Sequence, residues 1–273
     1  MYHYPPETTA QVLSKVREAL DKDEADDFKL TRIWTTLAFI HNYVLSTEIA
    51  GRIGPTVLSG PFKNMKLAKG AMEKAFGPIL MGCYEHELHG VVDRIMATPY
   101  KTILNIGCSF GYYAVGFALR MPQTKIEAFD ILEAEQKNCH ELATLNNVGD
   151  RVKVSGIYKG EDFAAYEKEK TLALVDIEGA ELQLLDPALY PALKKIDILV
   201  ELHDVFVPTI SKEIVERFKD THDIEVIYNR PYIFDFSIIS PPELYVDPID
   251  SFAVAWENRG GPTPWAYMRV KSL

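Results

Sequence analysis

Short apolar runs alternate with helix-like stretches over most of the chain after residue 100. The runs that could form strands lie at 102–106, 125–130, 151–156, 171–177, 224–228 and 265–270, with a further one inside 194–204. Several of them are almost wholly apolar, which is typical of strands buried on both faces of a sheet. Strands that alternate with helices form a parallel sheet covered by helices on both faces. The pattern therefore predicts an α/β fold with a seven-stranded, mostly parallel sheet.

The N-terminal part of the chain shows a helical pattern instead of an alternating one. Apolar residues recur at helical spacing over 12–20, and a second, more apolar helix is expected over about 30–49. We therefore divide the chain into an N-terminal helical cap, 1–80, and an α/β domain, 81–273. The sequence leaves open whether the cap only packs against the domain or forms a lid over a binding pocket.

Composition narrows the classes of partner. The chain has 273 residues with a formal net charge of −10, and a protein with no excess of cations is poorly suited to bind nucleic acid. Cys83, Cys108 and Cys139 form no C-x-x-C pair, which predicts reduced thiols in a cytoplasmic protein and no zinc site. The N-terminus does not resemble a secretory signal, and no apolar run reaches the ~20 residues of a membrane span. We expect no membrane partner.

A glycine-containing turn follows the first strand of the α/β part. Gly107 and Gly111 lie between the run at 102–106 and a helical stretch, and Asp130 ends the second strand about twenty residues beyond the turn. A carboxylate at that place can accept hydrogen bonds from a ribose diol. Ser109 stands where a dinucleotide fingerprint has its second glycine, so the turn disfavours NAD and FAD. S-adenosylmethionine has a ribose but no phosphates, and it makes no such demand.

The fourth and fifth strands end on ionisable side chains. Strand alternation places Asp176 and Glu178 on one side, and likewise Glu201 and His203 on one side. Acids gathered at neighbouring strand tips repel one another unless a sulfonium cofactor, a divalent metal or shared protons relieve the repulsion. The nearby acids that we assign instead to helix caps or to solvent are Glu181 and Asp204.

Several motifs together resemble the FkbM-type family of S-adenosylmethionine-dependent methyltransferases. They are GPFKNM (60–65), CYEHEL (83–88), NIGCSFGYYAVGFA (105–118), DIEGAE (176–181), ELHD (201–204), RFKDTH (217–222), and WENR (256–259) with Trp265. The resemblance implies a Rossmann-like class I methyltransferase fold, with 81–273 as the cofactor-binding catalytic domain. It also implies O-methylation of a hydroxyl on a small molecule such as a sugar or secondary metabolite. This sequence departs from the family at Asn105 and Ser109, which replace an acid and a glycine.

The resemblance assigns roles to individual residues. Tyr84 and Glu85 would approach the cofactor from a helix that leads into the first strand, and Gly107 and Gly111 would face its methionine and ribose. Strand order alone places Gly156 and Ile157 near the adenine. The full set of expected cofactor contacts is Tyr84, Glu85, Asn105, Gly107, Ser109, Gly111, Asp130, Ile131, Gly156, Ile157 and Asp176.

A hydroxyl acceptor must lose its proton during methyl transfer. His203 is our hypothesis for the general base, because it sits at a strand tip and its pKa suits neutral pH. Glu201 or Glu178 is expected to orient it. A second version uses a divalent metal held by Asp176 with a neighbouring acid, and we favour the metal-free version because acids alone do not establish a coordination geometry.

Two readings from other classes stay open. One is an NAD-dependent oxidoreductase of Rossmann type, and the other is a non-catalytic binder that keeps the fold, a reading that Asn105 encourages. In the methyltransferase reading the partner is a small-molecule acceptor, and the sequence allows a homodimer.

Overall fold

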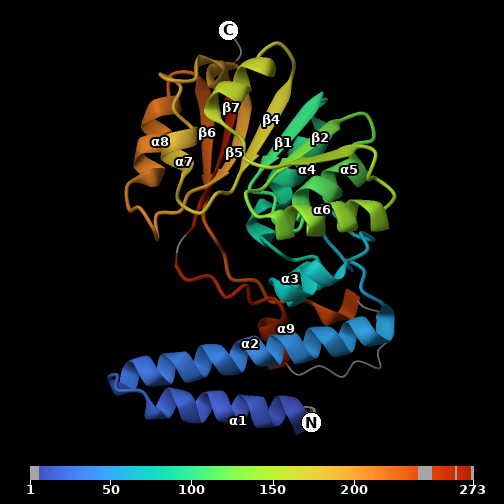
Figure 1. Cartoon of the computed structure of the whole chain (residues 1–273), viewed down its shortest axis with the longest axis vertical. Coiled ribbons are helices and arrows are strands. Elements are labelled where there is room, and N and C mark those ends of the chain that lie inside the picture. The colour runs from blue at the N-terminus through green and yellow to red at the C-terminus, as the bar shows by residue number, and fades with distance from the viewer. Residues whose placement is uncertain (1–5, 239–247, 262, 272–273) are drawn as a thin grey trace.

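The computed structural model describes residues 6–238, 248–261 and 263–271. Within these residues seven strands form one sheet in the order β3-β2-β1-β4-β5-β7-β6 (Figure 1). They are β1 (Thr102–Ile106), β2 (Lys125–Phe129), β3 (Val152–Ser155), β4 (Thr171–Val175), β5 (Asp197–Glu201), β6 (His222–Ile227) and β7 (Trp265–Val270). Strands β1 to β5 pair in parallel, whereas β7 runs antiparallel to both β5 and β6. The predicted sheet is confirmed, and its order is that of the class I methyltransferase fold.

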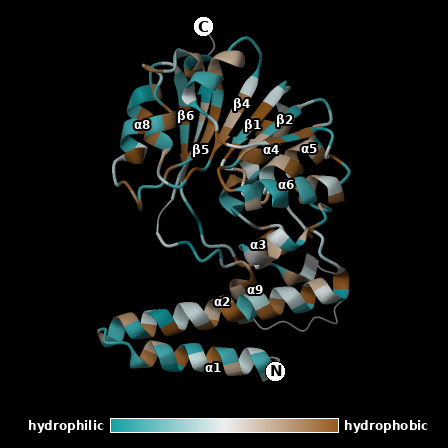
Figure 2. Cartoon of the chain, viewed as in Figure 1, coloured by the Kyte–Doolittle hydropathy of each residue, from teal (hydrophilic) through white to brown (hydrophobic). Residues whose placement is uncertain are grey.

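Helices cover both faces of the sheet, as predicted. Helices α4 (His89–Ala97), α5 (Tyr112–Arg120) and α6 (Glu133–Leu145) pack on one face. The other face carries α7 (Glu181–Leu184), α8 (Ile210–Phe218) and the short 3₁₀ helices η3 (Gly160–Ala165) and η4 (Pro191–Lys195). Strands β1, β4 and β5 are buried along their whole length because both faces are covered, which explains their apolar sequences (Figure 2).

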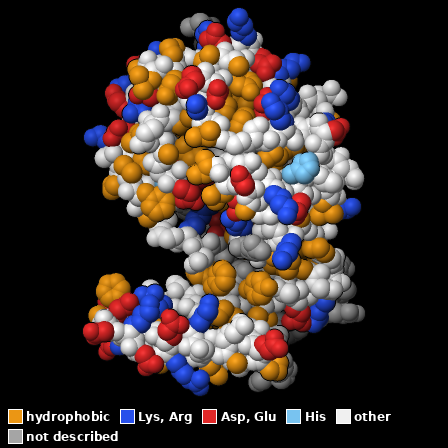
Figure 3. All heavy atoms as spheres, in the orientation of Figure 1, with side chains coloured by type: hydrophobic (Ala, Val, Ile, Leu, Met, Phe, Trp, Pro, Cys, Tyr) orange, Lys and Arg blue, Asp and Glu red, His pale blue; other side chains and the backbone are white. Residues whose placement is uncertain are grey.

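The N-terminal helices α1 (Pro6–Asp21) and α2 (Asp26–Ile53) pack side by side away from the sheet. Figure 3 shows this helix pair set off from the rounded α/β part by a notch. Short elements complete the fold, namely η1 (Lys69–Glu73), α3 (Phe76–Met81), η2 (His86–Leu88), η5 (Phe236–Ile238) and α9 (Pro248–Val254). Leu45 and Ile49 of α2 belong to the same buried cluster as α3, α4 and the sheet, so the end of α2 is joined to the main core.

The N-terminal part of α2 leaves large apolar side chains in contact with solvent. Trp34 is 68% exposed and Phe28 is 66% exposed. A homodimer stays a prediction. Among the described residues, no helix combines the length and apolar character that a membrane span needs.

The expectation that Tyr84 and Glu85 lie on the helix that leads into the first strand is wrong. Gly82 adopts a left-handed conformation (φ +75°) that ends α3, and the backbone amides of Cys83 and Tyr84 donate to Pro78 O at 2.9 and 3.1 Å. Glu85 is itself left-handed (φ +48°), and the α-helix begins only at His89. Tyr84 and Glu85 therefore lie on a turn, and the Pro78 carbonyl of α3 holds the start of that turn in place.

The close approach of the Gly107 backbone to the tip of β4 can be tested by substitution. At φ +79°, a Cβ at this position would lie 1.6 Å from Asp176 O. We expect Gly107→Ala to lower the free energy of unfolding by at least ~3 kcal/mol, since neither the backbone at the β4 tip nor the conformation can adapt cheaply. Gly90→Ala is the matched control, because its Cβ meets no atom within 4 Å on α4, and it should stabilise by roughly 0.4–1 kcal/mol. Urea denaturation measures both, and equal effects of the two substitutions would contradict the packing described.

Candidate functional site

The loops that leave the carboxyl ends of β1, β2, β3 and β4 enclose a cavity of about 590 Å³. Open parallel sheets bind ligands at this edge. The expected cofactor residues that line this cavity are Gly107, Ser109, Asp130, Ile131, Gly156, Ile157 and Asp176. Strand order thus brings together side chains from four separate loops.

Asp130 organises the floor of this first cavity. Its carboxylate accepts hydrogen bonds from Ser109 N and from Leu132 N, each at 2.9 Å. Gly107 N and Cys108 N donate to Phe129 O at 2.8 and 2.9 Å, so the turn is tied to the end of β2. A carboxylate oxygen has two acceptor positions, so each oxygen of Asp130 retains one for a ligand hydroxyl.

Gly111 packs against helix α6. It lines neither the first cavity nor the one beside it, and a Cβ on Gly111 would lie 2.6 Å from Cys139 Sγ on α6. Its φ of +96° also requires glycine. The residue is needed for the close packing of the turn against α6, and its role as a cofactor contact stays a prediction.

A second cavity of about 410 Å³ adjoins the first one. Gly107, Ser109, Asp176 and Glu178 line both, so the two cavities meet above the tips of β1 and β4. The remaining expected site residues that line the second cavity are Tyr84, Glu85, Asn105, Glu201 and His203. Its aromatic walls include Phe110, Tyr112, Tyr113 and Phe206. This cavity joins two turns and two strand tips that are far apart in the sequence.

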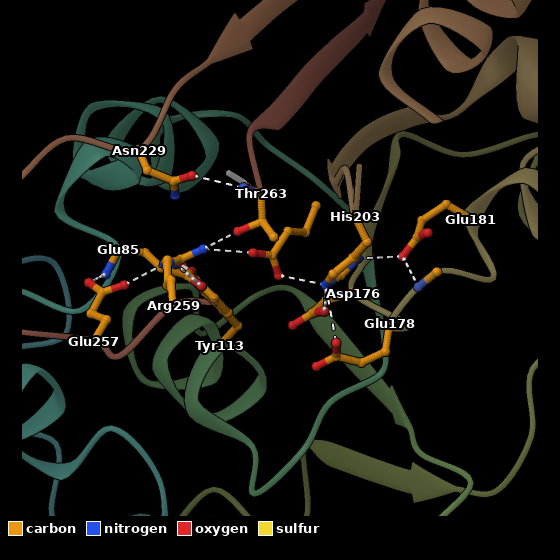
Figure 4. Close-up of polar contacts among 12 residues, drawn as sticks. Glu85, Tyr113, Asp176, Glu178, Glu181, His203, Asn229, Glu257, Arg259 and Thr263 are labelled. Atoms are coloured by element: carbon orange, nitrogen blue, oxygen red, sulfur yellow. Dashed lines mark hydrogen bonds and ion pairs between the residues drawn. The ribbon is translucent and has the colours of Figure 1, made fainter. Parts of the chain in front are cut away.

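His203 is held in place by Glu181. The ring is 3% exposed, and Nδ1 donates to Glu181 Oε1 at 2.7 Å, with Glu181 itself fully buried (Figure 4). Glu181 does not face solvent, and its Oε1 also accepts Gly179 N at 3.1 Å at the start of α7, as a capping side chain does. Asp204 likewise accepts Ser211 N at 2.9 Å near the start of α8.

The other ring nitrogen of His203 faces three carboxylates. Nε2 lies 3.4 Å from Glu178, 3.5 Å from Glu201 and 3.6 Å from Asp176. These separations exceed the 2.7–3.2 Å of a good hydrogen bond, so none of the three orients the ring as Glu181 does. The expectation that Glu201 or Glu178 orients His203 is therefore wrong.

Arg259 is the cation that the sequence argument did not find. Its guanidinium lies 2.7 Å from Glu201 Oε1, 3.0 Å from Glu85 Oε1 and 2.8 Å from Glu257 Oε2 (Figure 4). It also donates to Thr263 Oγ1 at 2.7 Å. Arg259 belongs to the WENR motif, but nothing local to that motif shows that it reaches the tip of β5.

Burial and like charges shift the pKa values of these groups. Burial raises the pKa of Glu85 to about 8, with Glu201 adding to the rise and Arg259 opposing it. Burial, followed by the charge of Glu201, also raises the pKa of Asp176 well above its ordinary value. The site holds more acids than it can keep ionised.

The His203–Glu181 pair is shifted in the opposite sense. Burial alone would lower the pKa of His203, but the hydrogen bond to Glu181 and the surrounding acids raise it overall. Burial alone would raise the pKa of Glu181, yet the hydrogen bond from His203 lowers it. The hydrogen bond between His203 and Glu181 therefore stabilises the charged form of each partner and opposes the effect of burial.

Asp176, Glu178 and His203 could also hold a metal ion. One donor atom from each lies within 4.8 Å of the others, a grouping found by examining the described residues. His203 has its second nitrogen bound to a carboxylate, as metal-binding histidines commonly do. The arrangement therefore suits two chemistries, proton transfer and cation binding.

Comparison with known proteins does not identify a family for this chain. No protein-family model and no curated protein matches the chain. Among solved structures, the O-methyltransferase TomG from Streptomyces achromogenes, involved in tomaymycin synthesis and in complex with SAM, is 13% identical. That match covers 76% of this chain and 92% of TomG, with a TM-score of 0.46. An O-methyltransferase from Bacillus cereus in complex with SAH is 11% identical over 97% of this chain and all of that one (100%), with a TM-score of 0.43. Such distant similarity gives no information on the reaction, which must be argued from the site.

The raised pKa of Glu85 predicts how stability depends on pH. As pH rises from about 4.5 to about 8, the unfolded chain loses this proton while the folded protein keeps it, so stability falls across that window. Glu85→Gln cannot titrate, and the parent should lose stability relative to it by up to ~1.4 kcal/mol per pH unit. Urea denaturation of both proteins between pH 5 and 8.5 measures the difference. A constant difference over that range would show that Glu85 is ionised throughout.

Proposed function

We propose that the protein is an S-adenosylmethionine-dependent methyltransferase of the FkbM type that methylates a hydroxyl of a small molecule. The observation that carries the proposal is the junction of two cavities at Gly107, Ser109, Asp176 and Glu178. One cavity has a ribose-type carboxylate, and the other has a buried imidazole fixed by a carboxylate. A donor with its nucleoside in the first cavity and its methionine part at the edge of the second would meet an acceptor from the second cavity at this junction.

The residues present suit the proposed cofactor. Asp130 has acceptor capacity for two ribose hydroxyls, and the exposed apolar side chains of Ile131 and Ile157 suit the faces of an adenine ring. Asn105 is 2% exposed, and its Oδ1 lacks a hydrogen-bond partner although it lines the second cavity. A buried acceptor of this kind suits the ammonium group of a methionine moiety. When bound, the cofactor supplies an electrophilic methyl group on a sulfonium.

The chain's own residues would align the reactants and move one proton. The Nδ1 hydrogen bond to Glu181 fixes the ring so that Nε2 faces the second cavity. In the neutral ring Nε2 carries the lone pair that accepts the hydroxyl proton. Phe206 lies parallel to the His203 ring at 5.7 Å and shields one of its faces from solvent. Alignment and exclusion of water supply much of the rate enhancement in displacements of this type.

Asp130 provides the test of cofactor binding. Asp130→Ala should weaken S-adenosylmethionine about 10- to 100-fold, because it removes charged hydrogen-bond acceptors worth ~1.5–3 kcal/mol. Glu133→Ala, an exposed acid three residues away, is the matched control and should bind as the parent does. Calorimetry with S-adenosylmethionine and with NAD measures both. Binding of NAD in preference would favour the oxidoreductase reading instead.

His203 provides the test of chemistry. His203→Ala should lower kcat about 10²- to 10⁴-fold in a labelled-methyl assay on hydroxylated acceptors, while donor affinity stays within a few-fold. Glu181→Gln should give a smaller loss, and His140→Ala on the exposed side of α6 should give none. A parental kcat in His203→Ala across the pH range would remove the base assignment. Product formation by the parent would itself exclude a non-catalytic binder.

A metal-assisted version is the second candidate, favoured by the grouping of Asp176, Glu178 and His203. There a divalent cation would lower the pKa of the acceptor hydroxyl. The metal-free version predicts full activity after dialysis against EDTA and no gain on adding Mg²⁺ or Mn²⁺. Activity that disappears with EDTA and returns with one of these ions would select the metal-assisted version.

A further inference from the structure

Arg259 and Glu257 reach the second cavity on a segment that the N-terminal helices hold. This segment follows α9, which lies against α2 between the helix pair and the sheet (Figure 1). Two neighbouring residues of α2 bind α9. His41 Nε2 lies 2.8 Å from Asp250 Oδ1, and Asn42 Nδ2 donates to Ala253 O at 2.6 Å. The contact thus joins the start of the chain to its last third.

Asn42 is enclosed at this contact. It is 7% exposed, and its amide also lies 3.4 Å from Trp256 O, the residue directly before Glu257. On its other side is Gly77 of α3, where a Cβ would lie 2.7 Å from the Asn42 amide and 2.6 Å from Val254 O. Helices α2, α3 and α9 are therefore closely packed at Gly77, where no side chain would fit.

Beyond Trp256 the packing is looser. A cavity of about 140 Å³ lies beside Phe39, Asn42 and Glu257. Glu257 then accepts Glu85 N at 2.7 Å, and Arg259 bridges to Glu85 and Glu201. Arg259 lies only three residues after Trp256, which Asn42 contacts, so a restraint at Asn42 limits where Glu257 and Arg259 can lie.

We propose that Asn42 is a positioning residue, which fixes the segment that carries Glu257 and Arg259 into the second cavity. The N-terminal helices are then part of the site and not a separate cover. The effect is confined to one side of the site. Glu257, Arg259, Gly260 and Thr263 line the second cavity, whereas the first cavity has no lining residue from this segment among those described.

Asn42→Leu keeps the size of the side chain and removes both hydrogen bonds. Hydrogen exchange of the full chain should show about 10-fold faster exchange of the amides at 250–261, with the strands and the 107–111 turn unchanged. Glu48→Ala, a partly exposed residue on the same helix, is the control and should leave exchange as in the parent. Unchanged exchange at 250–261 in Asn42→Leu would overturn the proposal. Should Asn42→Leu not fold, His41→Ala is judged by the same criterion.

A ligand pair tests the functional side, which rests on the proposed function. S-Adenosylhomocysteine spans both cavities in that proposal, whereas 5′-methylthioadenosine lacks the amino-acid part and needs only the first. Asn42→Leu should weaken the former about 10-fold and the latter less than 2-fold by calorimetry. An equal loss of affinity for both nucleosides would mean that Asn42 has a general structural role, and it would overturn the proposal that Asn42 is a positioning residue. If the parent binds neither nucleoside, the proposed function fails, and the exchange experiment alone decides the role of Asn42.

Discussion

The guanidinium of Arg259 is the one fixed positive charge that the described structure places among the buried acids at the tips of β4 and β5. It contacts Glu85, Glu201 and Glu257, which come from three separate parts of the chain. Burying a carboxylate without a partner costs several kcal/mol, so these acids could not gather here without it. The acids around Arg259 still outnumber it, and burial together with the charge of Glu201 raises the pKa of Glu85 to about 8. A site of this kind favours a ligand that brings positive charge, which is consistent with a sulfonium donor.

The close approach of two backbones gives the site its second constraint. Gly107 lies so near the carbonyl of Asp176 that no side chain fits between them. The turn after β1 and the tip of β4 are thereby fixed against each other at the point where the two cavities meet. An in-line methyl transfer needs donor and acceptor held in one geometry, and under the proposed function this rigid junction would supply it. Asp130 lines the first cavity and His203 lines the second, so the two proposed roles would lie on different sides of this junction.

The sequence predicted the parts of the structure that depend on local pattern. Apolar runs identified the strands, and the spacing from Gly107 to Asp130 identified the turn and its carboxylate. Parts that depend on long-range contacts were not predictable. Gly111 fits the motif, but what requires a glycine there is the close approach of the Cys139 thiol on α6.

Glu181 and Arg259 show the same limit in the site itself. Glu181 looked like a helix-capping acid because its reach to His203 depends on how α7 lies against the β5 tip. Arg259 could have been suspected from charge alone, since a crowd of acids calls for a cation, but sequence spacing does not say which arginine provides it. The position of the segment that carries Arg259 depends on helix α2, about 200 residues earlier in the chain.

The central claim is that a methyl-donating nucleoside lies over the turn at 107–111 with its ribose on Asp130. A crystal structure of the protein grown with S-adenosylhomocysteine tests it most directly. The account predicts ribose hydroxyls on the Asp130 carboxylate, the adenine beside Ile131 and Ile157, and the sulfur at the junction of the two cavities. A turn with no ligand above it, or a nucleoside bound elsewhere on the sheet, would contradict the account.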